Sequence, residues 1–202
     1  AEYRKLFDSP GAVDNIDVKE EWFKKGKNIY FNKQENYKSI PKYIIVYWIS
    51  QKVKKILENN IGLIQYAHQK TRISTGDNNR FLRLWYEINI NKMFYPEKWV
   101  PYSKGGAFRR WYGNYELVLN YENDGYELNN FKGFQKSNKD YYFKPGLTWS
   151  SLTMAKISFR FLNKGFICDA KGPLLYIENF RYRLYILGYL NSKITQSFLE
   201  FL

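Results

Sequence analysis

The spacing of hydrophobic residues predicts a helix on each side of a central region of strands. After Pro41, apolar residues recur at intervals of three and four, which is the period of one face of an α-helix. This face comprises Ile45, Trp48, Ile49, Val53, Ile56 and Leu57. The helix is expected to end at Asn59-Asn60. From about Phe180 the same spacing returns at Leu184, Leu187, Leu190, Ile194, Phe198 and Leu202.

Between about residues 61 and 175, short apolar and aromatic runs alternate with turn signals, a pattern typical of β-strands. The turns are rich in Gly, Pro, Asn and Asp, as in Asn123-Asp124-Gly125 and Lys144-Pro145-Gly146. The expected strands are residues 61–68, 81–88, 117–121, 141–143, 148–150, 156–161 and 165–170. A further strand is expected near residues 28–32, and a short helix near 127–135.

These elements predict an α+β fold, in which a curved, largely antiparallel sheet is flanked by helices at both ends. We expect a lead-in segment with short strands over residues 1–40, a central domain over 41–177 and the start of a helical region over 178–202. The chain begins at Ala1 without an initiator methionine and closes at Leu202 within a predicted helix. We therefore expect a fragment of a longer protein.

The charge balance indicates the class of partner. The 202 residues include 32 Lys and Arg against 19 Asp and Glu, a formal net charge of +13. A hydrophobic content of 45% supports a folded core and argues against disorder. The basic residues are spread along the chain, which predicts a broad positive surface rather than a charged tail. Such a surface favours polyanion binding, although a solvated basic face without a partner has the same composition.

The residue types exclude several classes of site. A single cysteine, Cys168, excludes an internal disulfide and a cysteine metal cluster. His68 is the single histidine, so a zinc site of the usual kind cannot be built, and we interpret His68 as a structural or surface residue. The sequence has no dinucleotide-binding glycine loop, Walker A loop, zinc-protease motif or nucleophile elbow.

The sequence also gives an expectation for the compartment. It contains no segment long and apolar enough to span a bilayer, and no signal peptide. We therefore expect a cytoplasmic protein that has no membrane partner.

The segment from Thr75 to Tyr86 is the most informative stretch, because a polar loop leads directly into a predicted strand. Gly76 can adopt backbone angles closed to other residues, and the flanking Thr, Asp and Asn residues favour turns. Such a loop can present backbone N–H groups to phosphate, and cations lie close by in sequence. An ordinary tight turn before a core strand would have the same composition.

Residues 98–113 interleave cations, aromatic residues and glycines. Gly105-Gly106 would let the backbone approach a nucleic acid closely, and outward cations would neutralise phosphates. The aromatic residues Trp99, Phe108 and Trp111 are expected mostly in the core. Two further basic-aromatic stretches are residues 139–146, which include Lys144, and residues 156–160.

Six blocks of residues in this order carry a family resemblance. They are Ser39-Ile40-Pro41 leading to Tyr47-Trp48-Ile49-Ser50, the stretch from Thr75 to Trp85, residues 98–113, residues 120–125, residues 140–150, and Leu187 to Lys193. Over roughly residues 37–202, the chain resembles the C-terminal target recognition region of BREX-type PglX proteins. It likewise resembles related restriction-modification enzymes that methylate adenine and carry methyltransferase and specificity regions in one chain.

The resemblance implies a target recognition domain for double-stranded DNA, which works beside an N-terminal methyltransferase domain of the same parent chain. Parent enzymes of this family transfer a methyl group from S-adenosylmethionine to adenine N6, within restriction-modification or phage-defence systems. Their catalytic Asn-Pro-Pro-Tyr motif and cofactor-binding glycine motif are absent here. We therefore expect no catalysis and no cofactor in this segment.

We expect phosphate contacts to position the protein and base contacts to specify the sequence. The expected phosphate contacts are Lys70, Arg72, Arg80, Arg83, Lys104 and Arg109. The expected contacts to base edges are Asn78, Asn79 and Arg110. The remaining expected DNA-binding residues are Thr75, Gly76, Gly105, Gly106 and Lys144.

Three other functions fit parts of the sequence. The aromatic residues would serve a single-strand or RNA-binding module as stacking platforms. The positive charge would also fit a protein-interaction domain with an acidic partner. A nuclease could use Asp124, Glu127 and Lys132, although their spacing is loose.

Overall fold

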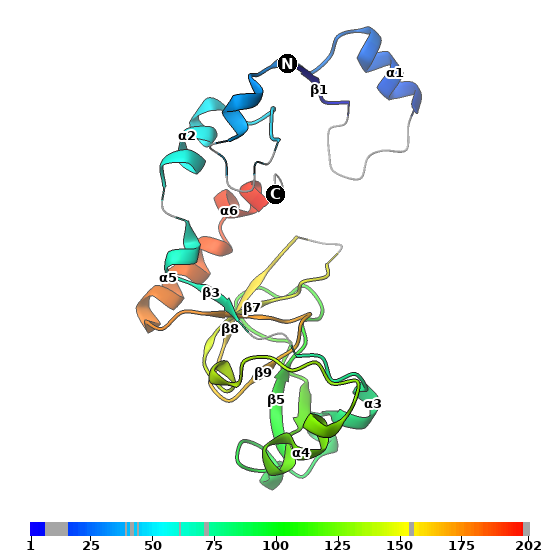
Figure 1. The fold of residues 1–202 in the computed structure, drawn as a ribbon, viewed down its shortest axis with the longest axis vertical. Coiled ribbons are helices and arrows are strands. Elements are labelled where there is room, and N and C mark those ends of the chain that lie inside the picture. Colours follow the sequence, from blue (N-terminus) through cyan, green and yellow to red (C-terminus); the bar gives the residue numbers. More distant parts are fainter. Residues whose placement is uncertain are drawn as a thin grey trace. The chain divides into compact units, whose positions relative to one another are not determined.

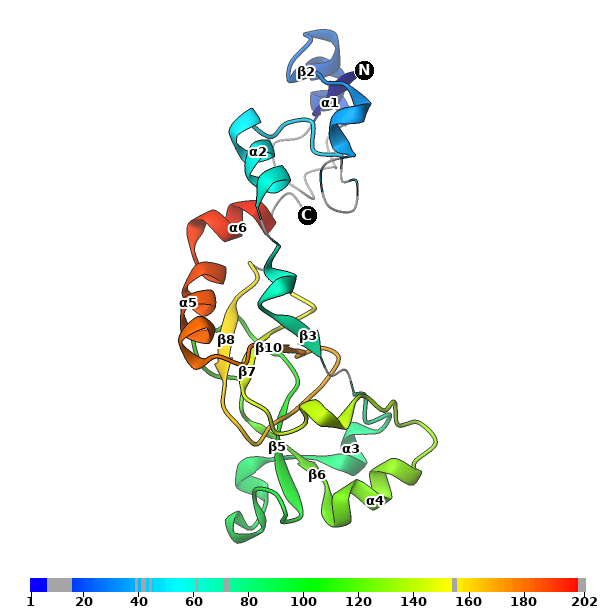
Figure 2. The same cartoon turned by 60° about the vertical axis from the view of Figure 1, so that its left-hand side comes forward.

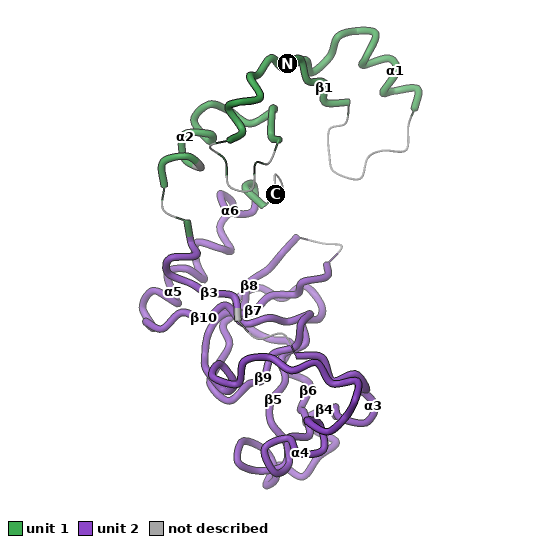
Figure 3. Tube along the Cα trace, in the orientation of Figure 1, with its two compact units in different colours: residues 1–62, 197–202 green, residues 63–196 purple. Residues whose placement is uncertain are grey.

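The structure, a computed structural model, describes residues 1–6, 16–38, 40, 43, 45–60, 62–70, 73–153 and 156–199 (Figures 1 and 2). It divides into two compact units, coloured separately in Figure 3. Unit 1 comprises residues 1–62 and 197–202, and unit 2 comprises residues 63–196. Helices and mainly antiparallel strands occur together, so the predicted α+β class is confirmed. The three segments expected from the sequence, residues 1–40, 41–177 and 178–202, stay a prediction.

Unit 1 is built around one strand pair. Strands β1 (Glu2–Arg4) and β2 (Ile29–Phe31) pair antiparallel, and β2 confirms the strand expected near residues 28–32. Helix α1 (Ile16–Lys24) lies between them in sequence, and a 3₁₀ helix, η1 (Gln34–Tyr37), follows. A small core is formed by Tyr37, Ile40 and Val46.

Helix α2 (Gln51–Asn59) is shorter than predicted. Its N-cap is Ser50, whose side chain accepts a hydrogen bond of 3.3 Å from the Val53 backbone N–H. Residues 45–50 are not helical, because Val46 and its neighbours pack into the unit 1 core instead of continuing a helical face. The predicted start was therefore wrong, while the predicted end is confirmed; Pro41 lies outside the described residues.

Unit 2 contains two four-stranded sheets. The first has the order β3-β10-β7-β8 with antiparallel neighbours throughout. Its strands are β3 (His68–Lys70), β7 (Gly146–Trp149), β8 (Phe159–Leu162) and β10 (Leu174–Tyr176). The second has the order β4-β6-β5-β9, with a single parallel pair, β5 with β9. Its strands are β4 (Leu82–Leu84), β5 (Trp99–Ser103), β6 (Leu117–Asn120) and β9 (Ile167–Cys168).

Short helices come before, between and after these strands in sequence. The 3₁₀ helices are η3 (Leu63–Gln65), η4 (Trp85–Glu87), η5 (Ile90–Lys92) and η6 (Lys139–Tyr141). The α-helices are α3 (Asn78–Phe81), α4 (Glu122–Asn130), α5 (Phe180–Leu190) and α6 (Lys193–Leu199). The helix predicted from Phe180 is divided at Asn191, whose side-chain amide bonds both the N–H and the carbonyl of Phe159 in β8.

Several predicted strands are corrected by the structure. Residues 61–68 contain η3, and the strand begins only at His68, which is exposed. Residues 141–143 are not a strand, because the chain turns through η6. Residues 81–88 hold only the three-residue strand β4, since capping by acidic side chains turns the chain on both sides. Strand β5 was missed, because its residues were interpreted only as a binding segment.

The main core of unit 2 lies on the sheet that contains β4, β5 and β6. Its buried members are Ile73, Phe81, Leu82, Val100, Tyr102, Leu119, Tyr121, Leu128, Tyr142 and Ile167. Within this core, the Tyr102 hydroxyl donates a 2.6 Å hydrogen bond to the buried carboxylate of Asp169. Burial raises the pKa of Tyr102, and Asp169 adds to the effect, so the tyrosine stays a donor. This sheet carries the loop described next.

Candidate functional site

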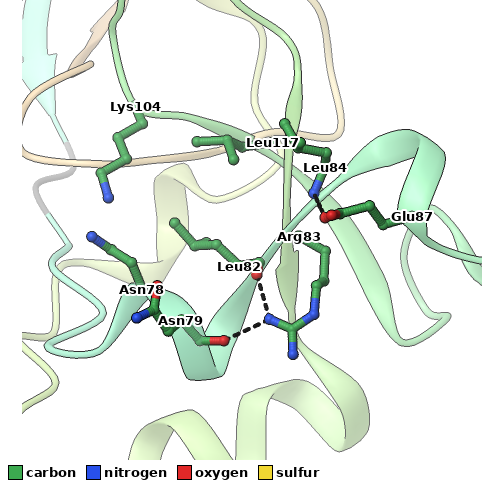
Figure 4. A pocket seen from close by; sticks show the side chains of 8 residues that line it. All are labelled: Asn78, Asn79, Leu82, Arg83, Leu84, Glu87, Lys104 and Leu117. Carbon is green, nitrogen blue, oxygen red and sulfur yellow. Dashed lines mark hydrogen bonds between the residues drawn. The ribbon is translucent and has the colours of Figure 1, made fainter.

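An open pocket of about 440 Å³ brings together four of the predicted binding residues (Figure 4). The four are Asn78 and Asn79 from α3, Arg83 from β4, and Lys104, which follows β5. The remaining lining residues are Leu82, Leu84, Glu87 and Leu117. Two amides and two cations therefore share one surface with a carboxylate.

Local hydrogen bonds shape the loop that enters this pocket. The buried Thr75 hydroxyl donates to Asn78 Oδ1 at 2.8 Å. Asp77 is the N-cap of α3, and its Oδ1 accepts from the Arg80 backbone N–H at 3.0 Å. Phe81 and Leu82 then enter the core. These hydrogen bonds and the buried Phe81 and Leu82 fix the backbone of the loop, while Asn78 and Asn79 remain exposed.

Gly76 allows two backbones to approach each other. Its φ of +73° is in the left-handed region, and a Cβ atom there would lie 2.4 Å from the Gly133 carbonyl oxygen. Next to this contact, Ser74 and Gln135 exchange backbone hydrogen bonds of 3.2 and 3.0 Å. The glycine is thus needed for the fold of the loop, whatever its N–H group binds.

Arg83 is held in place by the backbone of its own loop. Its Nη1 donates to the carbonyl oxygens of Asn79 and Leu82, both at 2.6 Å (Figure 4). Among the described residues, no carboxylate forms an ion pair with this guanidinium. An exposed charge in a defined orientation is available for an anion or for a hydrogen-bond acceptor.

Lys104 lies across the pocket, with its amino group pointing toward Asn78 (Figure 4). Burial lowers the pKa of Lys104 below the ordinary lysine value. The charge of Asp169 opposes this effect, and that of Lys171 adds to it. An anion bound in the pocket would favour the charged form of this lysine.

Glu87 is a pocket residue that the sequence analysis missed. Its Oε2 accepts a 2.7 Å hydrogen bond from the Leu84 backbone N–H and so caps η4. The spacing of three residues between a cap position and a glutamate is the available sequence signal. This carboxylate makes the pocket mixed in charge rather than purely basic.

Two predicted phosphate contacts already have carboxylate partners. Arg80 donates to Glu127 Oε1 at 2.7 and 2.8 Å, and Arg109 donates to Glu116 Oε1 at 2.9 Å. Both pairs are about half exposed, so each contributes little to stability. They nevertheless offset the positive charge that each arginine would offer to an anion.

Two further predicted cations, Lys144 and Arg110, are not among the residues that line the pocket. Lys70 ends β3, and Arg72 lies outside the described residues. The Lys144 ammonium lies 5.3 Å from the ring centres of both Tyr141 and Tyr176. Arg110 lies over the Phe108 ring at 5.6 Å. Of the described side chains, those of Lys144 and Arg110 are therefore not gathered with the pocket.

Gly105 and Gly106 each lie close to other protein atoms on the side where a Cβ would project. An added Cβ would lie 2.7 Å from the Lys171 carbonyl oxygen at Gly105, and 3.1 Å from the Asn114 side-chain nitrogen at Gly106. Both have positive φ values, +84° and +124°. Close packing within the chain thus accounts for this glycine pair.

The aromatic residues of the same segment correct another expectation. Phe108 and Trp111 are each 49% exposed, so the prediction that they lie mostly in the core was wrong. Trp111 instead pairs its backbone with β8, through hydrogen bonds to Phe159 and Phe161. This edge pairing holds the ring at the surface.

Arg160 of β8 is a second residue that was missed, and it is 0% exposed. Its Nη1 donates to the Arg109 carbonyl and its Nη2 to the Ser150 hydroxyl, both at 3.4 Å. Within the described residues its Nε has no hydrogen-bond partner. Burial lowers the pKa of this guanidinium from the ordinary arginine value.

The residues proposed for a nuclease do not assemble a metal site. Glu127 is paired with Arg80, and Asn123, Asp124 and Gly125 form a turn with positive φ values. No group of three His, Cys, Asp or Glu residues in the described ranges could hold a metal ion. Likewise, no helix in the described ranges is long and apolar enough to cross a membrane.

Comparisons with known proteins place this chain beside two long enzymes, although no family model matches it. It is 32% identical over 191 residues to the adenine-specific methyltransferase PglX of Lacticaseibacillus casei (strain Zhang). It is 36% identical over 151 residues to the adenine-specific methyltransferase BrxX of Escherichia coli O9:H4 (strain HS). These matches cover 86% and 72% of this chain, but only 16% and 12% of the relatives.

Proposed function

Because this chain is a PglX-type region, similar to part of two adenine-specific methyltransferases, we propose that its unit 2 recognises double-stranded DNA. The observation that carries the proposal is the pocket of Asn78, Asn79, Arg83 and Lys104. Cations supply the phosphate affinity, and amides and arginine can bond base edges. The net charge of +13 would draw the chain to DNA from a distance.

In the proposed parent protein, a separate methyltransferase domain binds S-adenosylmethionine and methylates adenine. The region described here positions the DNA, so that the target base can leave the helix and enter that domain. This region takes no part in the chemistry and binds no cofactor itself. Its partners are accordingly duplex DNA and the methyltransferase domain of its own chain.

The proposed contacts differ in strength. Lys104 would meet phosphate directly, together with Lys70 and Arg72. Arg80 and Arg109 would first have to leave Glu127 and Glu116, so their contribution would be smaller. Thr75, Gly76, Gly105 and Gly106 would act through the shape of the backbone.

The test is a selection of duplexes from a random pool by the full 202-residue chain, at about 0.1 M salt. The pocket variant replaces Arg83 and Lys104 by glutamine. A matched control replaces Lys24, which ends α1, and the following Lys25 by glutamine, and so removes the same number of positive charges far from the pocket in sequence. We expect the pocket variant to lose about tenfold or more in duplex affinity, and the control less than about threefold.

Each result of this selection supports or contradicts one of the functions considered. An enriched sequence motif supports a recognition domain. If the pocket variant and the control bind equally, the pocket is not the interface. If the unchanged chain retains no duplex, the proposal is wrong, and an acidic protein partner becomes the better explanation.

Single-stranded nucleic acid is a second candidate ligand, because aromatic rings are exposed in one segment. Phe108, Trp111 and Tyr112 are 49%, 49% and 60% exposed, and Arg110 lies over the Phe108 ring. Such rings can stack on unpaired bases. Competition between a duplex and its separated strands distinguishes the two ligands, since the first proposal requires the duplex to bind more tightly.

A further inference from the structure

We propose that Arg83 reads the major-groove edge of a guanine, while Lys104 meets the phosphate backbone. This inference rests on the proposed duplex recognition and assigns the two cations of the pocket different roles. It departs from the sequence-based expectation, which placed Arg83 among the phosphate contacts.

The first argument is the orientation of the guanidinium. Two carbonyl oxygens, of Asn79 and Leu82, hold Nη1 at 2.6 Å each, so one corner of the group is fixed by the backbone. Neither Nε nor Nη2 of Arg83 makes a hydrogen bond within the described part of the chain. The edge that carries these two donors is therefore presented as a fork, with little freedom left to lose on binding.

A fork of two parallel donors matches the two acceptors of guanine, O6 and N7. It also matches two oxygens of a phosphate, so orientation alone does not choose between these ligands. The surroundings of Arg83 supply the second argument.

The Glu87 carboxylate lines the same pocket. One of its oxygens, Oε2, is held by the Leu84 N–H at 2.7 Å, which fixes the carboxylate near the pocket. No ion pair joins Arg83 to Glu87 in the described ranges, so Glu87 does not neutralise Arg83. A phosphate beside Arg83 would be repelled by this negative charge, whereas a neutral base pair would not.

A carboxylate can moreover accept a hydrogen bond from the exocyclic amino group of cytosine. Arg83 and Glu87 together thus offer two donors and one acceptor, the complement of a G·C pair seen from the major groove. Lys104 offers a flexible point charge from the opposite side of the pocket and suits a phosphate.

Three other arginines of unit 2 lack this combination. Arg80 and Arg109 already bind carboxylates at 2.7 and 2.9 Å, and Arg160 is buried. Arg83 alone, among these four, is exposed and aligned by neutral carbonyl oxygens.

The test compares the duplex preferences of the full chain with those of Arg83→Lys, Arg83→Ala and Lys104→Gln, at several salt concentrations. Arg83→Lys keeps the charge but removes the fork. We expect it to keep the salt dependence of the unchanged chain and to lose roughly 5- to 150-fold discrimination at one G·C position. Lys104→Gln should weaken binding to all sequences alike and reduce the salt slope by about one.

The outcomes separate this inference from the proposed function. If Arg83→Lys keeps the G·C preference, or if Arg83→Ala weakens all sequences alike with a reduced salt slope, Arg83 is a phosphate contact and the inference is wrong. If the unchanged chain binds no duplex, the proposed function fails as well. Thermal unfolding of each variant, followed by circular dichroism, shows whether a loss of binding reflects a loss of fold.

Discussion

The pocket around Arg83 and the polar cluster around Arg160 each hold an arginine with neutral oxygen atoms, but they differ in solvent access. Arg83 donates to two carbonyl oxygens at 2.6 Å and remains exposed. Arg160 donates to a carbonyl and a hydroxyl at 3.4 Å and is fully buried. The bonds of Arg83 are short and orient an open group, whereas those of Arg160 are long and only partly satisfy a group removed from water, since its Nε has no hydrogen-bond partner within the described residues.

The difference shows that two arginines of one fold can suit different roles, one in packing of the interior and the other in contact with a ligand. Arg160 fills a fully buried site and donates to two neighbouring groups, so its side chain is expected to support the structure that surrounds it. An exposed, oriented charge costs the fold little, and its effect appears when a ligand arrives. Measurements that separate stability from binding therefore test the comparison directly.

The largest effect is expected at Arg160. Replacement by alanine should lower the free energy of unfolding by about 3 kcal/mol, because it empties a fully buried site and leaves the Arg109 carbonyl and the Ser150 hydroxyl with fewer partners. Urea unfolding measures this loss, with Arg83→Ala as the matched control, expected within about 0.5 kcal/mol of the unchanged chain. Equal stability of the two variants would contradict the comparison.

An intermediate effect is expected at Gly76. Alanine there would combine a positive φ with a Cβ placed 2.4 Å from the Gly133 oxygen, so the loop must shift at a cost of about 2 kcal/mol. Gly188→Ala is the control, because its added Cβ has no neighbour within 4 Å and Gly188 lies inside α5. Urea unfolding should show Gly188→Ala to be neutral or slightly stabilising. A neutral Gly76→Ala would show that the two loops separate easily.

The smallest effect is expected in the pH dependence of DNA affinity, through the protonation of Lys104. Because burial lowers its pKa, Lys104 loses its proton at a lower pH than an ordinary lysine, and a bound phosphate favours the protonated form. DNA affinity should therefore fall as pH rises toward the usual lysine range. Titrations between about pH 7 and pH 10 should show a flatter profile for Lys104→Gln. If the DNA affinities of the unchanged chain and of Lys104→Gln depend on pH in the same way, Lys104 does not contact the DNA.

The local chemistry of the pocket could be predicted from sequence better than its long-range pairing. The turn-forming residues Thr75 and Asp77 act over three residues, so their hydrogen bonds follow from spacing. The partner of Arg80, by contrast, is 47 residues away, and only the packed fold brings Glu127 beside it. The sequence therefore predicted which residues line the candidate pocket better than it predicted which of their neighbouring cations are already paired.

The same difference between local and long-range contacts explains the errors in the predicted fold. Strand β6 was predicted because its short apolar run, Leu117 to Leu119, is visible in consecutive residues and is bounded by turn signals. The start of α2 was not, because Val46 belongs to a core that depends on Tyr37 and Ile40 as well as on local spacing. Arg160 was missed for a similar reason: a strand residue becomes fully buried only when other segments cover it.

The close approach of Gly76 and Gly133 fixes the backbone of the loop that leads into α3, while the side chain of Asn79 stays exposed. Asn79 and Arg83 lie on this backbone without filling any of the core, so other side chains could replace them, whereas Asn78 Oδ1 accepts the hydrogen bond of the buried Thr75 hydroxyl and belongs to the fixed part of the loop. A library built to test and vary the proposed DNA recognition should therefore randomise Asn79 and Arg83 and keep Asn78. The two glycines should stay unchanged, so that each member of the library presents its new side chains from the same platform.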